Sequence, residues 1–217
     1  MITAKDIHLS YGNLEVLKGV NLEIKEGEFV SIVGSSGAGK TTLLQILGSL
    51  EKPTSGEIII NNKNISNINN KKLDRFRNQE IGFIFQFHNL LEEFTAIENI
   101  CLPAFISGKN KRESIKRAQE LLELLNLKNR DHHKPNELSG GAQQRVAVAR
   151  ALINSPSIIL ADEPSGNLDS KNAKQLHKLL LEINEKTNQT IVVVTHSKEL
   201  SNITSRKLEI RDGVISN

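Results

Sequence analysis

The stretch FVSIV-GSSGAGKT-TLLQIL, Phe29–Leu47, decides the fold. Five residues typical of a buried strand run into a glycine-rich turn, and the apolar residues after it recur at helical spacing. Gly34–Thr41 fits the pattern G-x-x-x-x-G-K-[ST], whose glycines let backbone N–H groups close around phosphate oxygens at a helix N-terminus. A turn that only joins a strand to a helix is the plain alternative. Strand, loop and helix in this order favour nucleotide binding.

The loop supplies several candidate contacts to the nucleotide. We expect Lys40 to reach the β- and γ-phosphates as a point charge, and the Thr41 hydroxyl to be a ligand of Mg²⁺. ATPases, GTPases and small-molecule kinases share this loop, so it does not choose among them. The candidate nucleotide-binding residues here are Gly34, Ser35, Ser36, Gly37, Ala38, Gly39, Lys40, Thr41 and Thr42.

Two acids follow a second apolar run, Ile158–Ala161. A strand that ends in Asp162 and Glu163 places carboxylates at the carboxyl edge of the sheet, where nucleotides bind in α/β proteins. Asp162 suits a second contact to the metal, and Glu163 is the candidate general base that deprotonates the attacking water. A solvated loop start is the alternative for such an acid pair when it occurs alone.

A second candidate phosphate site lies in Leu138–Arg145, LSGGAQQR. Ser139, Gly140 and Gly141 precede an amphipathic helix, and a helix N-terminus attracts anions. On its own, Ser-Gly-Gly favours a flexible helix cap over a phosphate site.

Around these motifs, segments typical of strands alternate with segments typical of helices. Strands are expected at 2–9, 20–24, 57–60, 158–160, 190–195 and 207–210, and helices at 41–50, 115–127, 146–153 and 172–186. The asparagine-rich Asn61–Asn70 predicts a solvated loop. Helical periodicity from about residue 95 to 153 predicts an inserted helical lobe.

Composition narrows the class further. The chain has 217 residues, 38% of them apolar and 24% charged, which is typical of one globular α/β core. A net charge of +3 without a basic block does not indicate a nucleic-acid partner. One cysteine, no secretory leader and no long apolar run predict a cytosolic protein that reaches a membrane only through a partner.

LSGGAQQR is similar to the signature motif of ABC ATPases, and phosphate loop, signature and acid pair stand in the order those proteins use. The resemblance covers essentially the whole chain. It implies an α/β fold: a P-loop NTPase core with a mostly parallel sheet, flanking helices and an antiparallel β subdomain, plus an inserted α-helical subdomain. The implied core is 1–86 with 155–217, and the helical subdomain is about 87–154.

The resemblance also assigns roles. Tyr11 stacks on adenine, Gln86 senses Mg²⁺ and the attacking water, and His196 contacts the γ-phosphate; Asp162 holds the metal through water. Without the family, Tyr11 reads as a turn residue, Gln86 as a strand-end amide, His196 as a helix cap, and the phenylalanines at 83, 85, 87 and 94 as core filling.

The implied assembly is a head-to-tail homodimer around two ATP, with Asn167–Asp169 crossing the interface and a membrane permease held near Phe85–Phe94. Residues 81–91, 93–99 and 161–169 resemble the lipoprotein-releasing and macrolide-export branch, which places the chain on the cytoplasmic face of the inner membrane. A small-molecule phosphotransferase and a cell-division ABC ATPase without a transported substrate are the rivals.

Overall fold

The computed structural model describes residues 1–216 and divides into two compact units. The first comprises residues 1–74 and the chain from residue 183 onward; the second comprises residues 75–182. The predicted boundary of the helical subdomain, about 87–154, falls inside the second unit and stays a prediction. Each unit carries part of the chemistry predicted above.

The first unit contains an antiparallel sheet in the order β2-β1-β4-β5. Its strands are β1 (Ile2–Tyr11), β2 (Leu14–Ile24), β4 (Ser55–Ile60) and β5 (Lys63–Asn64). The register of β1 shifts between Ala4 and Ile7, both of them buried, and Asp6 between them has a φ of 50°. This bulge lets apolar residues three apart face the same core.

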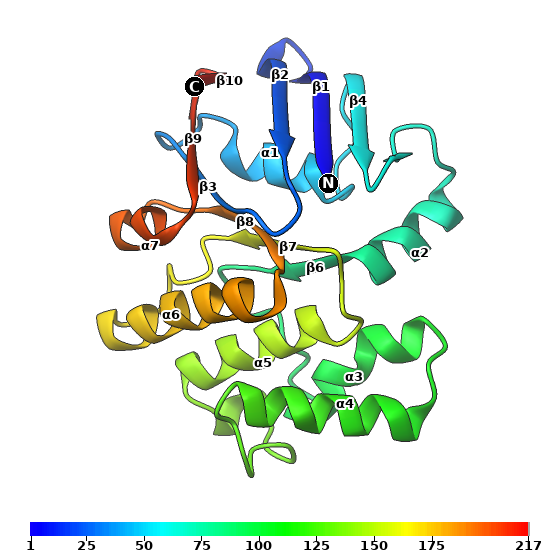
Figure 1. Ribbon diagram of the computed structural model, residues 1–217, viewed down its shortest axis with the longest axis vertical. Coiled ribbons are helices and arrows are strands. Elements are labelled where there is room, and N and C mark those ends of the chain that lie inside the picture. Colours follow the sequence, from blue (N-terminus) through cyan, green and yellow to red (C-terminus); the bar gives the residue numbers. More distant parts are fainter. Residues whose placement is uncertain (217) are drawn as a thin grey trace. The chain divides into compact units, whose positions relative to one another are not determined.

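Parallel strands form the rest of this unit. β3 (Phe29–Val33) lies between β8 (Thr190–Val194) and β9 (Arg206–Arg211), and it runs parallel to both. β10 (Val214–Ser216) pairs antiparallel with β9 and forms a hairpin with it. All five residues of β8 are buried, as expected for a strand covered on both faces. The helices here are α1 (Lys40–Leu47) and α7 (Lys198–Ile203) (Figure 1).

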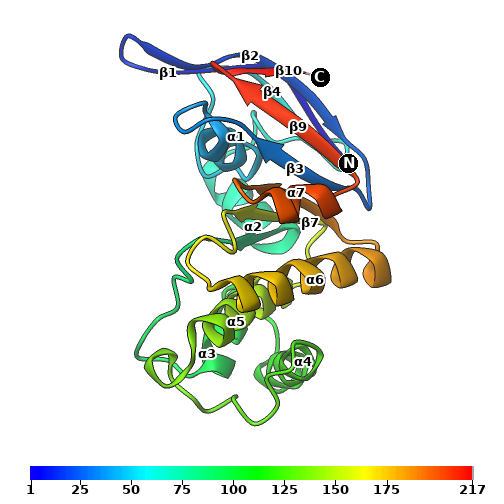
Figure 2. The ribbon, with the colours of Figure 1, turned by 90° about the vertical axis from the view of Figure 1, so that its left-hand side faces the viewer.

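The second unit joins a parallel strand pair to a group of helices. β6 (Ile81–Ile84) pairs with β7 (Ile158–Asp162), and α3 (Ala96–Ile106) packs against α4 (Lys111–Leu124) and α5 (Gly140–Leu152), as Figures 1 and 2 show. A short 3-10 helix, Pro135–Glu137, precedes α5. Helices α2 (Asn70–Glu80) and α6 (Ser170–Thr187) each run across a boundary between the units.

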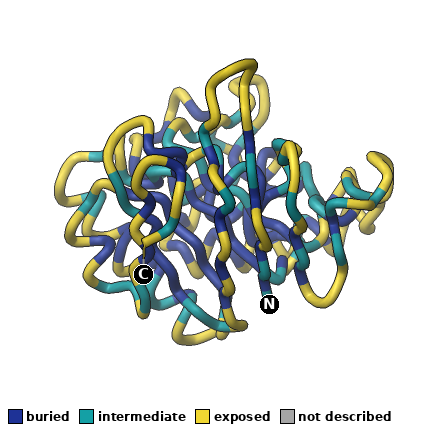
Figure 3. The backbone as a smooth tube through the Cα atoms, turned by 90° about the horizontal axis from the view of Figure 1, so that it is seen from above, coloured by how far each residue is buried: buried dark blue, intermediate teal, exposed yellow. Residues whose placement is uncertain are grey.

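Local sequence explains where the helices of the second unit begin. Thr95 and Glu98 form a reciprocal capping box at α3, and Asn110 accepts two backbone N–H bonds at the start of α4. Buried positions follow the strands and inner helix faces, whereas turns and outer helix faces are exposed (Figure 3).

The predicted α/β class is confirmed, one local expectation is wrong and one helix was not foreseen. The segment Asn61–Asn70 contains strand β5 and the buried Ile65, because Ile65 donates its N–H to the carbonyl of Ile58 and so extends the sheet. Helix α2 was not expected, since its mean hydropathy is low and Phe76 is its one buried residue. None of the helices within residues 1–216 combines the length and apolarity needed to cross a bilayer.

Candidate nucleotide site

The phosphate loop connects β3 to α1 in the first unit. Gly34, Gly37 and Gly39 have φ values of 155°, 78° and 98°, which side-chain-bearing residues rarely adopt. A Cβ on Gly34 would stand 2.2 Å from the backbone oxygen of Ile210, so no other residue fits there without moving β9. The first amide groups of α1 have no carbonyl within the helix to bond, and they supply the donors for an anion.

Lys40 anchors this loop. Its side chain is only 6% exposed, and its Nζ donates to the carbonyls of Gly34 (3.1 Å) and Ser35 (2.8 Å). The ammonium therefore lies against the first two residues of the loop. Positive charge, a helix N-terminus and a glycine backbone in one small volume fit the phosphates of a nucleotide.

Two further predicted residues belong to the same unit. Thr195 donates its N–H to the carbonyl of Ile32 at 3.2 Å, so His196 leaves β8 at the sheet edge where the phosphate loop leaves β3. Ser197, not His196, caps α7 by accepting the N–H of Leu200, so the helix-cap interpretation of His196 is wrong. His196 is exposed at this edge.

Tyr11 ends β1 opposite Leu14, at the tip of the β1–β2 hairpin, and is 51% exposed. It is a strand end and not part of the turn. β2 contacts the phosphate loop, because a Cβ on Gly39 would meet the Leu17 side chain at 2.9 Å. An exposed aromatic ring on a hairpin that touches the loop suits a nucleobase.

In the second unit, three predicted residues leave the parallel strands at one edge. Ile84 of β6 is in register with Ala161 of β7, so Gln86 lies beyond the end of β6 on the side where β7 ends at Asp162 and continues into Glu163. Glu163 has a φ of 44° and precedes a proline, a backbone conformation that costs about 1–3 kcal/mol and is concentrated at functional sites.

Gln86 is held by the loop after Glu163. Its Nε2 donates to Asn167 Oδ1 at 3.1 Å, and Asn167 Nδ2 donates back to the Gln86 carbonyl at 3.2 Å. Gly166 permits this approach, because a Cβ there would lie 2.9 Å from Gln86 Nε2. The structure thus joins Gln86 to Asn167–Asp169, although Asn167 lies 81 residues after Gln86 in the chain.

The signature residues begin α5. Ser139 is its N-cap and accepts the N–H of Ala142 at 3.3 Å, so the helix-cap interpretation holds as local structure, and Ser139 and Gly140 are exposed. Gly141 is buried against α6, where a Cβ would meet Asn172 Oδ1 at 2.5 Å. An exposed serine and glycine at the N-terminus of a 13-residue helix can contact an anion.

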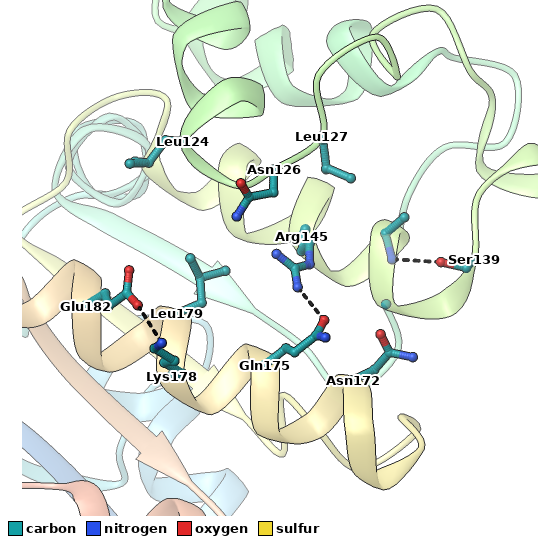
Figure 4. A pocket seen from close by; sticks show the side chains of 12 residues that line it. Leu124, Asn126, Leu127, Ser139, Arg145, Asn172, Gln175, Lys178, Leu179 and Glu182 are labelled. Carbon is teal, nitrogen blue, oxygen red and sulfur yellow. Dashed lines mark hydrogen bonds and ion pairs between the residues drawn. The ribbon is translucent and has the colours of Figure 1, made fainter.

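A polar pocket of about 550 Å³ adjoins the signature (Figure 4). Ser139, Arg145 and Asn172 lie around it, and Arg145 donates to Gln175 of α6 at 2.8 Å and to the carbonyl of Leu125 at 3.1 Å. The bond to Gln175 joins α5 to α6, and the bond to Leu125 joins α5 to the end of α4.

The segment 87–95, called here the aromatic loop, contains most of the predicted partner surface, Phe85–Phe94. Phe87 is 70% exposed and Phe94 is 37% exposed, so for these two the core-filling interpretation is wrong. The rings of Phe83 and Phe85 stack nearly parallel, with 5.7 Å between the ring centroids. The loop presents apolar side chains to solvent.

Polar residues that the motif analysis did not single out hold this loop in place. The buried Asn99 accepts the N–H of Leu91 at 2.8 Å and donates to the carbonyls of Leu91, Phe94 and Thr95. Arg150 donates to the carbonyls of His88 and Asn89, and burial lowers the pKa of its guanidinium. Burial also lowers the pKa of the His88 imidazole. A hydrogen bond with the Gly140 backbone acts in the opposite direction and partly offsets this shift.

The side chains available as ligands limit the kind of metal site that the chain can form. Within residues 1–216, no group of three or more His, Cys, Asp and Glu side chains could hold a metal ion. Mg²⁺ keeps waters and takes one or two protein oxygens together with substrate phosphates, so it does not need such a cluster of side chains. The hydroxyl of Thr41, at the start of α1, is the kind of oxygen that fits a cation arriving with the nucleotide.

The chain matches known proteins along most of its length. Residues 17–166 match the family model described as ABC transporter. The chain is 55% identical to the lipoprotein-releasing system ATP-binding protein LolD of Cytophaga hutchinsonii, over 99% of this chain and 98% of the relative, and 56% identical to LolD of Bacteroides fragilis, over 99% and 100%.

A solved structure agrees with this. The dimeric, post-hydrolysis ATP-binding cassette MJ0796 bound to ADP and Pi has a TM-score of 0.91 and 44% identity, covering 100% of this chain and 97% of that one. The chain belongs to the ABC transporter family and is an ATP-binding, ATP-hydrolysing subunit.

Proposed function

We propose that the chain is the ATPase subunit of a lipoprotein-releasing ABC complex. Identity above 50% over nearly the whole chain to two proteins of that name carries this proposal. The complex would sit on the cytoplasmic face of the inner membrane, with this chain driving an integral permease. Nucleotide binding is common to the family, whereas the released substrate is the specific part of the proposal.

The proposed working unit is a head-to-tail homodimer with two ATP. Ser139, Gly140 and Gly141 of one copy would close over the phosphates held by Gly34–Thr42 of the other, and Tyr11 would stack on the adenine. Support comes from the exposed N-terminus of α5 and from the dimeric cassette among the solved structures. Two anion-binding helix ends per chain then have one explanation.

In the proposed reaction, Glu163 accepts a proton from the water that attacks the γ-phosphorus. Lys40 and His196 stabilise the negative charge on the transferring phosphoryl group, and Gln86 orients the water. Mg²⁺, held by Thr41, Gln86 and, through water, Asp162, would supply further neutralisation of phosphate charge. Loss of the γ-phosphate removes the anion that both copies bind, so the dimer opens.

Glu163→Gln tests the roles of the base and the dimer. The amide keeps the shape of the side chain and cannot accept the proton, so turnover should fall by a factor of about 10² or more while ATP binding persists. Size-exclusion chromatography with light scattering should show an ATP-dependent dimer. Glu123→Gln, at an exposed ion pair with Lys128, is the matched control and should behave like wild type. An ATP-hydrolysing monomer would sink the proposal.

The permease contact is proposed at Phe85–Phe94, supported by the exposure of Phe87 and Phe94. Phe87→Glu should reduce recovery of the membrane partner in affinity purification from detergent-solubilised membranes. Val214→Glu, at another exposed apolar position in β10, should not. Identification of a lipoprotein-processing permease supports the proposal; a division-site membrane protein would favour the rival function instead.

A further inference from the structure

Gln144, in the second turn of α5, is a fully buried amide beside the candidate site. Its exposure is 0%, and its Nε2 donates to the carbonyl of Pro164 at 2.7 Å and to that of Phe85 at 3.3 Å. Its Oε1 is buried and has no hydrogen-bond partner among the described residues. Both donors are used, and the acceptor is left without a partner.

The two carbonyls belong to the segments that carry the proposed chemistry. Phe85 directly precedes Gln86, and Pro164 directly follows Glu163. One amide group thus bonds the backbone next to the proposed water-orienting residue and next to the proposed base. Gln144 itself belongs to α5, which begins with the exposed Ser139 and Gly140, so its amide connects three segments of the second unit.

The geometry is unusual for a residue that only fills space. A buried polar atom without a partner costs free energy, and an apolar side chain of the same length would avoid that cost. The Glu163 backbone is in addition strained, with a φ of 44°, so its position depends on the bonds around it. The bond from Gln144 to Pro164 is one of these, and the bond from Gly166 N–H to the Glu163 carbonyl is another.

We propose that Gln144 is a positioning residue for ATP hydrolysis, whose buried amide sets Gln86 and Glu163 relative to each other and to the signature helix. A shift of α5 when its N-terminus contacts phosphate is then passed to both residues through a single side chain. This inference rests on the proposed roles of Glu163 and Gln86. It adds the residue that joins them.

Gln144→Met tests the inference, because methionine has a similar length and volume but donates no hydrogen bond. We expect kcat for phosphate release to fall about 10- to 100-fold, since displacements near 1 Å at reacting groups have effects of this size. Binding of a fluorescent ATP analogue should change by less than about twofold, which separates catalysis from binding. Gln144→His, which keeps one N–H donor, should restore part of the lost kcat.

The control is Asn154→Leu. Asn154 is another amide of the second unit that donates to two acceptors, the Asn78 carbonyl and Oδ1, and its own Oδ1 is likewise buried without a partner among residues 1–216. It bonds neither candidate segment through these contacts. This variant should lose thermal stability as Gln144→Met does, and yet keep wild-type kcat.

A double-mutant cycle with Gln86→Ala provides a second measurement. If Gln144 acts through Gln86, the two changes together should lower kcat by much less than the product of the single effects. An unchanged kcat in Gln144→Met, or full additivity of the two changes in the cycle, would overturn the inference about Gln144. If Glu163→Gln is inactive in the same experiments, the proposed function still stands. Normal turnover by Glu163→Gln would overturn both. If Gln144→Met does not fold, the kcat of Gln144→His, alone and with Gln86→Ala, decides.

Discussion

Asn99→Leu should detach the aromatic loop from α3 without changing the phosphate loop. The Asn99 side chain is fully buried and makes four bonds, one accepted from the Leu91 N–H and three donated to backbone carbonyls. At roughly 1 kcal/mol net each, reduced because the half-exposed loop can bond water instead, the loss is about 2–4 kcal/mol. For a domain of this size the expected fall in Tm is about 5–12 °C.

The Leu91 amide reports the change directly, because its hydrogen bond to Asn99 Oδ1 measures 2.8 Å. Hydrogen exchange at this amide should accelerate strongly in Asn99→Leu, and capture of the membrane partner should fall. Asn110→Ala removes the N-cap of α4 at a cost of about 1 kcal/mol and is the control, since it should leave the Leu91 amide protected. Unchanged Leu91 exchange in a folded Asn99→Leu protein would show that the aromatic loop does not depend on Asn99.

Three other outcomes are expected. Gly34→Ala should abolish nucleotide binding in an equilibrium titration, because its Cβ would meet the Ile210 backbone oxygen at 2.2 Å. Cys101 is 1% exposed and burial raises the pKa of its thiol to about 11, so a thiol reagent at pH 8 should label it only on the timescale of unfolding. Hydrogen bonds from Thr95 lower the pKa of the Glu98 carboxyl from its ordinary value of 4.5. The stability that this carboxylate contributes is present above that pH and is lost as the pH falls below it. Glu98→Gln should therefore flatten the acid side of a curve of Tm against pH.

Local order explains what the sequence predicts well. The phosphate loop and the acid pair are each continuous segments, so strand, turn and helix, or strand and carboxylates, can be read from neighbouring residues. Phe29–Val33 was predicted with its observed bounds, because every position is apolar or small and the glycine turn ends it. The signature is also continuous, but its Ser139 looks the same whether it caps a helix, binds an anion or does both.

Residues whose hydrogen-bond partners lie far away in the sequence cannot be recognised in this way. Gln144 bonds carbonyls 59 and 20 residues away, and Asn99 lies in an apolar helix where an asparagine gives no periodic signal. Helix α2 follows an asparagine-rich segment and buries one side chain, so it has no continuous apolar face that would predict a helix. These contacts depend on tertiary packing, which brings distant backbone carbonyls within reach of one amide.

The left-handed backbone at Glu163 sets stability and activity against each other. A φ of 44° costs a glutamate energy that glycine would not incur, and asparagine would incur less of it. Directed evolution for heat resistance alone should therefore enrich Glu163→Gly or Glu163→Asn and return hardier proteins that no longer turn over ATP. A screen that also demands phosphate release should keep glutamate at this position and find its gains elsewhere in the chain.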